Sequence, residues 1–212
     1  MSNLISSSRA LSAAFAAKLP KYFTADEVHR IIYTHPPYEK RSNRKSITLY
    51  QKRFLCWFLW QTGVRISEAL DTVTADIEPY TRVVHFRTLK KKKKTIRTLP
   101  KTGESGEGFF EQVMLYIEIM EAWTRKPMSK LFEISYATGY RWINESCKQA
   151  GINDERAHPH TFRHSFAINC ILQGISPAVL QIWLGHSDIN KTMIYARVIA
   201  QDTSKQMEGV EF

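Results

Sequence analysis

The polar residues best suited to act together lie between positions 158 and 164. This segment reads His158-Pro-His160-Thr-Phe-Arg163-His164 and lies at the start of a predicted helix. His160 and Arg163 are three residues apart and therefore share one face of that helix. An imidazole and a guanidinium presented together near a helix N-terminus suit an anion such as a phosphate. The alternative is a metal site at His160 and His164, but no nearby Asp, Glu or Cys completes a ligand set.

Two other segments add polar groups of the same kind. Thr62-Gly-Val-Arg65-Ile-Ser-Glu68 places an arginine just after a helix-ending glycine, and Glu68, one turn further on, can hold the guanidinium in one orientation. Taken alone, a structural Arg–Glu pair would explain this segment better. Leu184-Gly-His186-Ser-Asp188 is followed, nine residues after the histidine, by Tyr195. A tyrosine on an amphipathic helix is more often core packing than a nucleophile.

The charge of the chain indicates a polyanionic partner. The formal net charge is +10 and the pI is near 9.6, which favours nucleic acid or an anionic membrane surface. Between Pro79 and Gly103 there are nine basic residues and no acidic one, namely Arg82, Arg87, Lys90, Lys91, Lys92, Lys93, Lys94, Arg97 and Lys101. A solvated surface explains such a run as well as nucleic acid does.

Composition excludes several classes of protein. With 43% hydrophobic residues the chain can form a sizeable core, so wholesale disorder is excluded. The longest apolar run, Phe54 to Trp60, is far shorter than the roughly 20 residues that a membrane span needs, and no membrane association is expected. Three widely spaced cysteines favour neither a disulfide framework nor a zinc ribbon, so a reducing cytoplasm is expected.

The elements that must position these groups are mostly helices. Two runs that alternate with period two, Val83 to Arg87 and Thr95 to Leu99, predict a hairpin whose tip is the lysine run. A capping box at Thr24 to Glu27 predicts the start of a first helix, which carries Val28, Ile31 and Ile32. Further helices are predicted at about 47–61, 113–123, 137–150, 161–171, 177–184 and 193–198. The helix at 177–184 is expected to be capped by Ser176 and to stop at Gly185. The fold class is therefore mainly α with a small antiparallel β-sheet (α+β).

Taken together and in this order, these motifs resemble the tyrosine recombinase (phage integrase) family. The resemblance rests on Gly63-Val-Arg65-Ile-Ser-Glu68, the basic hairpin, His160-Thr-Phe-Arg163-His164, Leu184-Gly-His186-Ser and Tyr195, and it runs from about Tyr22 to Tyr195. It implies the catalytic-domain fold of that family. It also implies a site-specific DNA recombinase that cleaves and rejoins strands through a 3′-phosphotyrosyl intermediate, without a metal or another cofactor.

The resemblance assigns roles residue by residue. Tyr195 would be the nucleophile, Arg65 and Arg163 the paired phosphate clamps, and His160 and His186 the histidine positions. A hairpin lysine would be the general acid. The family's interval to Pro100 selects Lys92, while counting forward from Val83 falls beside Lys90, which is the second choice.

The resemblance also predicts domains and partners. Residues 1–20 are expected to be a flexible N-terminal arm, 21–195 the catalytic domain, and 196–212 a tail that docks on a neighbouring protomer. With so short an N-terminal part the chain is similar to the small recombinases that invert fimbrial promoter segments. The expected partners are double-stranded DNA, three further copies in a tetramer, and accessory DNA-bending proteins. Two alternatives stay open: a catalytically silent DNA-binding regulator, and a relaxase of supercoils like the type IB topoisomerases.

Overall fold

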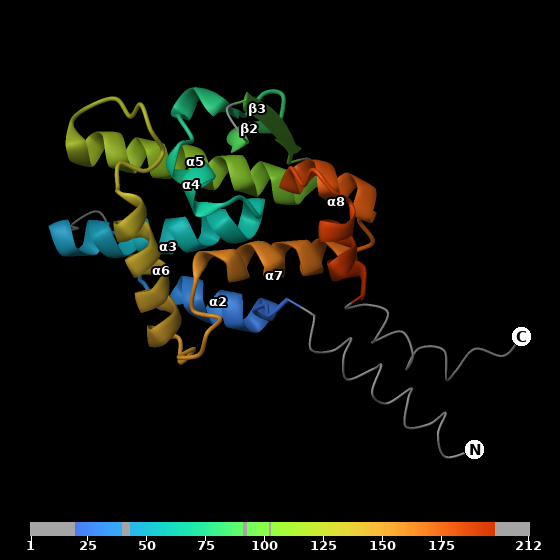
Figure 1. Cartoon of the computed structure of the whole chain (residues 1–212). Coiled ribbons are helices and arrows are strands. Elements are labelled where there is room, and N and C mark those ends of the chain that lie inside the picture. The colour runs from blue at the N-terminus through green and yellow to red at the C-terminus, as the bar shows by residue number, and fades with distance from the viewer. Residues whose placement is uncertain (1–19, 40–42, 91–92, 102, 198–212) are drawn as a thin grey trace, which may run out of the picture.

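The computed structural model describes residues 20–39, 43–90, 93–101 and 103–197, and the elements are shown in Figure 1. Of the predicted arm and tail, only residues 20, 196 and 197 belong to the described part. The elements in chain order are α2 (Ala25–Tyr33), α3 (Arg44–Thr62), α4 (Ile66–Leu70), the 3-10 turn η1 (Thr74–Asp76), β1 (Ile77–Glu78), β2 (Val83–Lys90), β3 (Lys93–Pro100), α5 (Gly103–Thr124), α6 (Tyr136–Gln149), α7 (Pro159–Leu172) and α8 (Pro177–Leu184). Residues 190–197 are also helical.

Helix α3 lies in the centre of the bundle, with α2, α6 and α7 packed against it (Figure 1). Its apolar residues are buried on more than one side, and Phe54, Leu55, Phe58 and Leu59 are at most 4% exposed. The helix ends where the sequence predicts, because Gly63 adopts the left-handed conformation (φ 61°) that favours glycine. The predicted capping box is also present, since Thr24 accepts a hydrogen bond from the Glu27 amide and the Glu27 carboxylate accepts one from the Thr24 amide.

The sheet has three antiparallel strands in the order β1-β2-β3. The predicted hairpin is confirmed, but its strands are longer than expected and the register pairs Val83 with Pro100 and Lys90 with Lys93. The short strand β1 was missed, because two residues carry no readable alternation. Val84, Phe86 and Leu99 on the inner face are at most 1% exposed, so the sheet is anchored to the helical core.

A second, smaller core holds the C-terminal part of the described chain together. It is formed by the second half of α7, by α8 and by the helical segment 190–197, and its buried members are Phe166, Ala167, Ile168, Cys170, Ile171, Leu180, Leu184 and Tyr195. As predicted, Ser176 caps α8 by accepting a hydrogen bond from the Val179 amide. The segment 190–197 follows an Asp188 carboxylate that accepts a hydrogen bond from the Asn190 amide. This core brings Tyr195 next to α7.

Candidate active site

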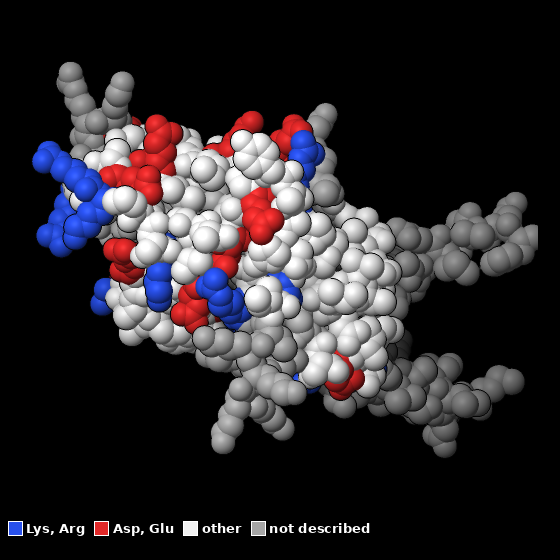
Figure 2. Space-filling view, turned by 90° about the horizontal axis from the view of Figure 1, so that it is seen from above, with Lys and Arg blue, Asp and Glu red and all other residues white. Residues whose placement is uncertain are grey.

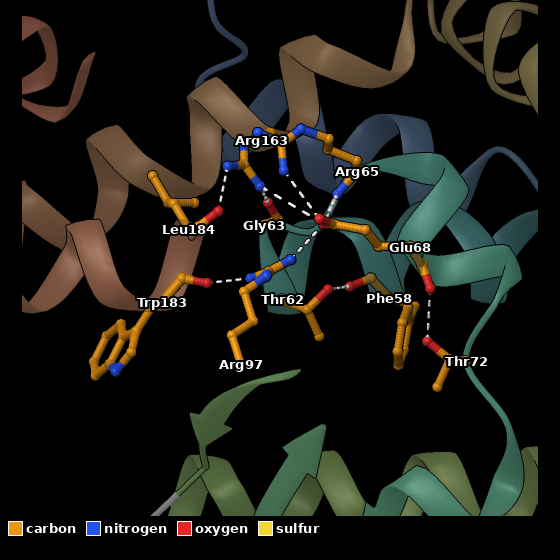
Figure 3. A network of polar contacts seen from close by, with 10 residues as sticks. All are labelled: Phe58, Thr62, Gly63, Arg65, Glu68, Thr72, Arg97, Arg163, Trp183 and Leu184. Atoms are coloured by element: carbon orange, nitrogen blue, oxygen red, sulfur yellow. Dashed lines mark hydrogen bonds and ion pairs between the residues drawn. The ribbon is translucent and has the colours of Figure 1, made fainter. Parts of the chain in front are cut away.

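Glu68 is the centre of a cluster of arginines contributed by three separate parts of the fold (Figure 3). Its carboxylate accepts hydrogen bonds from Nη1 of Arg65 at 2.9 Å and from the Arg65 amide at 2.9 Å. Arg97, from β3, donates to the same carboxylate, and Nη1 of Arg163, from α7, lies 4.0 Å from it. Glu68 is 5% exposed, so these interactions are little weakened by water. The sequence-based prediction that Glu68 orients Arg65 is confirmed.

Arg163 is held by backbone carbonyl groups at the ends of two helices. Its Nη1 donates to the Gly63 carbonyl at 2.9 Å, and its Nη2 donates to the Leu184 carbonyl at 2.6 Å. Two features require glycine at position 63. Its φ is positive, and an added Cβ would lie 2.1 Å from the Phe166 ring. Burial, followed by the neighbouring Arg65, lowers the pKa of Arg163 to about 9.

The cluster has more positive than negative charge. Three guanidinium groups surround one carboxylate, which leaves a surplus of two positive charges at a site that is largely shielded from water. Arg97 and Arg163 are buried, whereas the Arg65 side chain is 32% exposed and therefore reaches the surface. Such a site can bind an anion whose charge is delocalised over several oxygens, as in a phosphate.

Tyr195 is 2% exposed, and its hydroxyl lies 2.9 Å from Nδ1 of His164. Burial raises the pKa of the phenol, while the nearby positive charges of Arg163 and Arg65 lower it. The imidazole of His186 lies nearly parallel to the Tyr195 ring, with 6.5 Å between the ring centroids. Nδ1 of His186 is 2.9 Å from the Thr192 hydroxyl, which orients the ring.

His160 lies on the exposed side of the same cluster. Burial of the imidazole, then the charges of His158, Arg163 and Arg65, lower its pKa, so the ring is close enough to both arginines to respond to them. The structure thus brings together five of the six predicted site residues, namely Arg65, His160, Arg163, His186 and Tyr195. They come from the N-cap of α4, from α7, from the turn after α8 and from the segment 190–197.

Comparison with known proteins decides the family. The model of the phage integrase family matches residues 21–202 of this chain. The chain belongs to this family. It is 30% identical over 213 residues to the resolvase of Escherichia coli strain K12, which covers 88% of this chain and 75% of that protein. It is 32% identical over 146 residues to the tyrosine recombinase XerA of Saccharolobus solfataricus, which covers 68% of this chain and 45% of that protein.

Solved structures with the same fold include recombinase catalytic domains. The catalytic domain of bacteriophage HP1 integrase matches with a TM-score of 0.59 at 23% identity, over 84% of this chain and 87% of that one. XerH recombinase bound to its difH substrate matches with a TM-score of 0.65 at 21% identity, and this chain spans about half its length, 51%. The predicted family and fold class are therefore confirmed. So is the predicted class of enzyme, a tyrosine recombinase that cleaves and rejoins DNA strands.

The general acid of this recombinase stays a prediction. Lys92 lies outside the described residues, and for Lys90 only the backbone is described, at the end of β2 and paired with Lys93. The hairpin that carries both lysines is packed against the arginine cluster through Arg97. The position of a lysine side chain at the site stays a prediction, because the described contact of the hairpin with the cluster is made by Arg97, which pairs with Phe86.

Three arginines of the basic run in this recombinase make contacts within the protein. Arg97 is 8% exposed and donates to the Glu68 carboxylate and the Trp183 carbonyl, so it belongs to the interior of the fold and not to an exposed basic surface. Arg82 pairs with Glu107 and Arg87 pairs with Asp76, because acids distant in sequence fold back onto the sheet. Figure 2 shows one face on which acidic and basic side chains are mixed among mostly uncharged residues. The surplus charge of the chain is therefore not gathered among the described residues of this face.

Sequence reasoning missed two residues of the site. His164 was recognised as part of the motif but not as a partner of Tyr195, because no local spacing indicates a contact between residues that are 31 positions apart. Arg97 was listed only as one of the nine basic residues between Pro79 and Gly103, although the alternation of β3 places it on the same face as the buried Leu99. Among the described residues, no group of three or more His, Cys, Asp or Glu could hold a metal ion. No helix in the described part is long and apolar enough to cross a membrane.

Proposed function

We propose that this recombinase attacks a phosphodiester of double-stranded DNA with the Tyr195 hydroxyl and forms a 3′-phosphotyrosyl link. The observation that carries the proposal is the position of Tyr195, whose hydroxyl lies 2.9 Å from Nδ1 of His164, the residue next to Arg163 in a cluster with surplus positive charge. A phosphodiester repels nucleophiles, so attack needs cations that interact more strongly as charge builds on the equatorial oxygens. Arg65 and Arg163 supply these cations.

The reaction conserves the energy of the phosphodiester bond in the phosphotyrosyl bond that replaces it. The tyrosine oxygen forms a bond to phosphorus as the bond from phosphorus to the 5′-oxygen breaks, and that oxygen takes a proton from the general acid. We assign this proton to Lys92, with Lys90 as the second choice. Attack by a 5′-hydroxyl of another strand reverses the step and releases Tyr195. Exchange of strands therefore needs neither a nucleotide cofactor nor a metal ion.

The histidines handle the remaining protons and charges. We assign to His164, whose Nδ1 lies 2.9 Å from the tyrosine oxygen while Tyr195 is buried, the role of accepting the phenolic proton as the segment 190–197 shifts. His160 and His186 flank the arginine cluster and would donate hydrogen bonds to the phosphate oxygens as charge develops. Since Tyr195 is 2% exposed, the segment 190–197 must shift before the phenol reaches a phosphate. We infer that DNA binding and this shift are coupled.

The assembly and location follow from the substrate. Two duplexes exchange four strand ends, so we propose a tetramer on DNA in which the 196–212 tail docks on the next protomer, with residues 21–195 as the catalytic domain and 1–20 as an arm. We also propose DNA-bending accessory proteins, and a place of action in the cytoplasm, where bacterial DNA lies.

Trapping the covalent complex tests the proposed function. The protein is incubated with nicked fragments of its host replicon, so that the short strand released by cleavage diffuses away and religation fails. Covalently bound DNA is then sequenced, and the modified peptide is identified by mass spectrometry after nuclease digestion. We expect one DNA sequence and one modified tyrosine, Tyr195. Modification of Tyr136 or Tyr140 instead would overturn the assignment, and a complete absence of adducts would favour a silent regulator.

A further inference from the structure

Arg97 is the buried arginine that the predicted chemistry leaves without a role. It lies on β3, is 8% exposed, and its guanidinium is 5.1 Å from the centre of the Phe86 ring. Burying a cation is costly unless its partners are well placed, and an apolar side chain of similar volume often stabilises a fold equally well. The retained charge therefore calls for an explanation beyond packing.

Arg97 and Arg163 share the same two supports (Figure 3). Arg97 donates to the Glu68 carboxylate, and Arg163 lies 4.0 Å from the same carboxylate. Arg97 also donates to the Trp183 carbonyl, while Arg163 donates to the Leu184 carbonyl at 2.6 Å. Two guanidinium groups from different elements thus hold one carboxylate and two consecutive carbonyl groups.

The turn between α8 and His186 packs closely against the Arg97 side chain. Gly185 ends α8 with a φ of 65°, and an added Cβ there would lie 2.9 Å from Cδ of Arg97. The absence of a side chain at position 185 lets the turn approach the arginine closely. A displacement of Arg97 would therefore be passed to Leu184, whose carbonyl holds Arg163, and to His186.

We propose that Arg97 is a positioning residue that fixes Glu68 and the 183–186 turn, and thereby holds Arg163 in the geometry that receives the scissile phosphate. It does not touch DNA. This inference rests on the proposed roles of Arg65 and Arg163. It assigns a function within the active site to a basic residue that its sequence context places among the DNA contacts.

The test compares two substrates that make different demands on the arginines. One nicked duplex carries an ordinary scissile phosphodiester, and the other carries a methylphosphonate, in which a methyl group replaces one charged oxygen. Cleavage rates at saturating DNA, and DNA affinities, are measured for the wild type, Arg97→Met and Arg97→Lys. Arg82→Met is the matched control, because Arg82 is a partly exposed arginine at the far end of the sheet whose partner Glu107 is also exposed.

We expect Arg97→Met to cleave the phosphodiester at least about 10-fold more slowly, because a misplaced Arg163 stabilises the transition state less. On the methylphosphonate the loss should shrink to about 3-fold or less, and DNA affinity should stay within about 2-fold on both substrates. Arg97→Lys should recover part of the rate, since an ammonium group can satisfy one of the two acceptors. Arg82→Met should cleave both substrates like the wild type.

Equal losses on the two substrates, or no loss on either, would overturn the proposal. If circular dichroism and thermal melting show that Arg97→Met does not fold, the same comparison with Arg97→Lys decides, because that variant keeps the buried charge paired. Failure of the underlying function is distinguishable, since a wild-type protein that forms no adduct at Tyr195 would refute both. A wild type that reacts, with equal losses in the variants, would refute only the role of Arg97.

Discussion

Nδ1 of His164 lies 2.9 Å from the phenolic oxygen of Tyr195, where Tyr195 is buried and His164 is half-buried. Burial, then the charges of His160 and Arg163, lower the pKa of His164 to about 4. The imidazole is therefore neutral near pH 7, and its Nδ1 can accept the proton that Tyr195 must lose.

Replacing His164 by Phe should slow cleavage by about 100-fold at saturating DNA, because the phenol loses its nearest proton acceptor. DNA affinity should not change. The rate of the variant should rise with pH above 7 as the phenol ionises without help, and single-turnover adduct formation across that range measures it. His29→Phe, an exposed change on α2, is the control. A variant with the wild-type rate and pH profile would exclude His164 from the proton transfer.

Replacing Tyr195 by Phe should abolish the covalent adduct and leave DNA binding within about 2-fold of the wild type. Only the hydroxyl is removed, while the arginine cluster stays in place. The lost hydrogen bond to His164 should reduce the free energy of unfolding by about 1 kcal/mol. Denaturing electrophoresis of trapped complexes detects the adduct. Tyr140→Phe, at an exposed position of α6, should react normally, and an adduct that persists in Tyr195→Phe would place the nucleophile elsewhere.

Replacing Lys92 by Ala should slow cleavage of ordinary DNA but leave cleavage of a 5′-bridging phosphorothiolate nearly unchanged, because a thiolate leaves without a proton. Lys91→Ala and Lys93→Ala should instead weaken binding to both substrates equally and reduce the salt dependence of the affinity by about one phosphate contact. Cleavage and binding assays at several salt concentrations separate the two patterns. Rescue at Lys90 would move the general acid by two residues, and rescue at none would remove it from the hairpin.

Acid should destabilise the protein through His35. This side chain is 1% exposed, its Nε2 lies 2.7 Å from the Ser146 hydroxyl, and burial followed by the charge of Lys52 lowers its pKa from 6.5 to about 4. The unfolded chain therefore binds the proton more readily, so stability that is present above about pH 6.5 is lost as the pH falls toward about 4.

Between about pH 7.5 and about pH 5, His35 should account for a loss of about 2 kcal/mol in the free energy of unfolding. Urea titrations measure this loss, and His35→Gln, which keeps a polar group near Ser146, should flatten it. His164 is also buried with a lowered pKa, so part of the acid sensitivity should remain. The exposed variant His29→Gln should behave like the wild type. An equal acid sensitivity in His35→Gln would refute this role.

The local sequence was sufficient to predict most elements and much of the site. Glycines 63 and 185, the caps at Thr24 and Ser176, and the period of the hairpin mark the ends of elements by local chemistry, and each was confirmed. The partners of buried groups could not be predicted in this way. Arg97 meets Glu68 across 29 residues and His164 meets Tyr195 across 31, and such pairings are set by how helices and strands pack.

The way in which Arg163 is held decides which neighbouring positions can be changed. Its two closest acceptors are main-chain oxygens of Gly63 and Leu184, which every amino acid carries. The hydrogen bond from Arg163 to residue 184 therefore does not depend on the side chain at that position. Variants with other apolar residues at position 184 should keep the carbonyl acceptor. Position 63 offers no such latitude, because any larger residue would strike Phe166. A redesign around Arg163 must therefore keep Gly63, whereas the side chain at position 184 can vary among apolar residues.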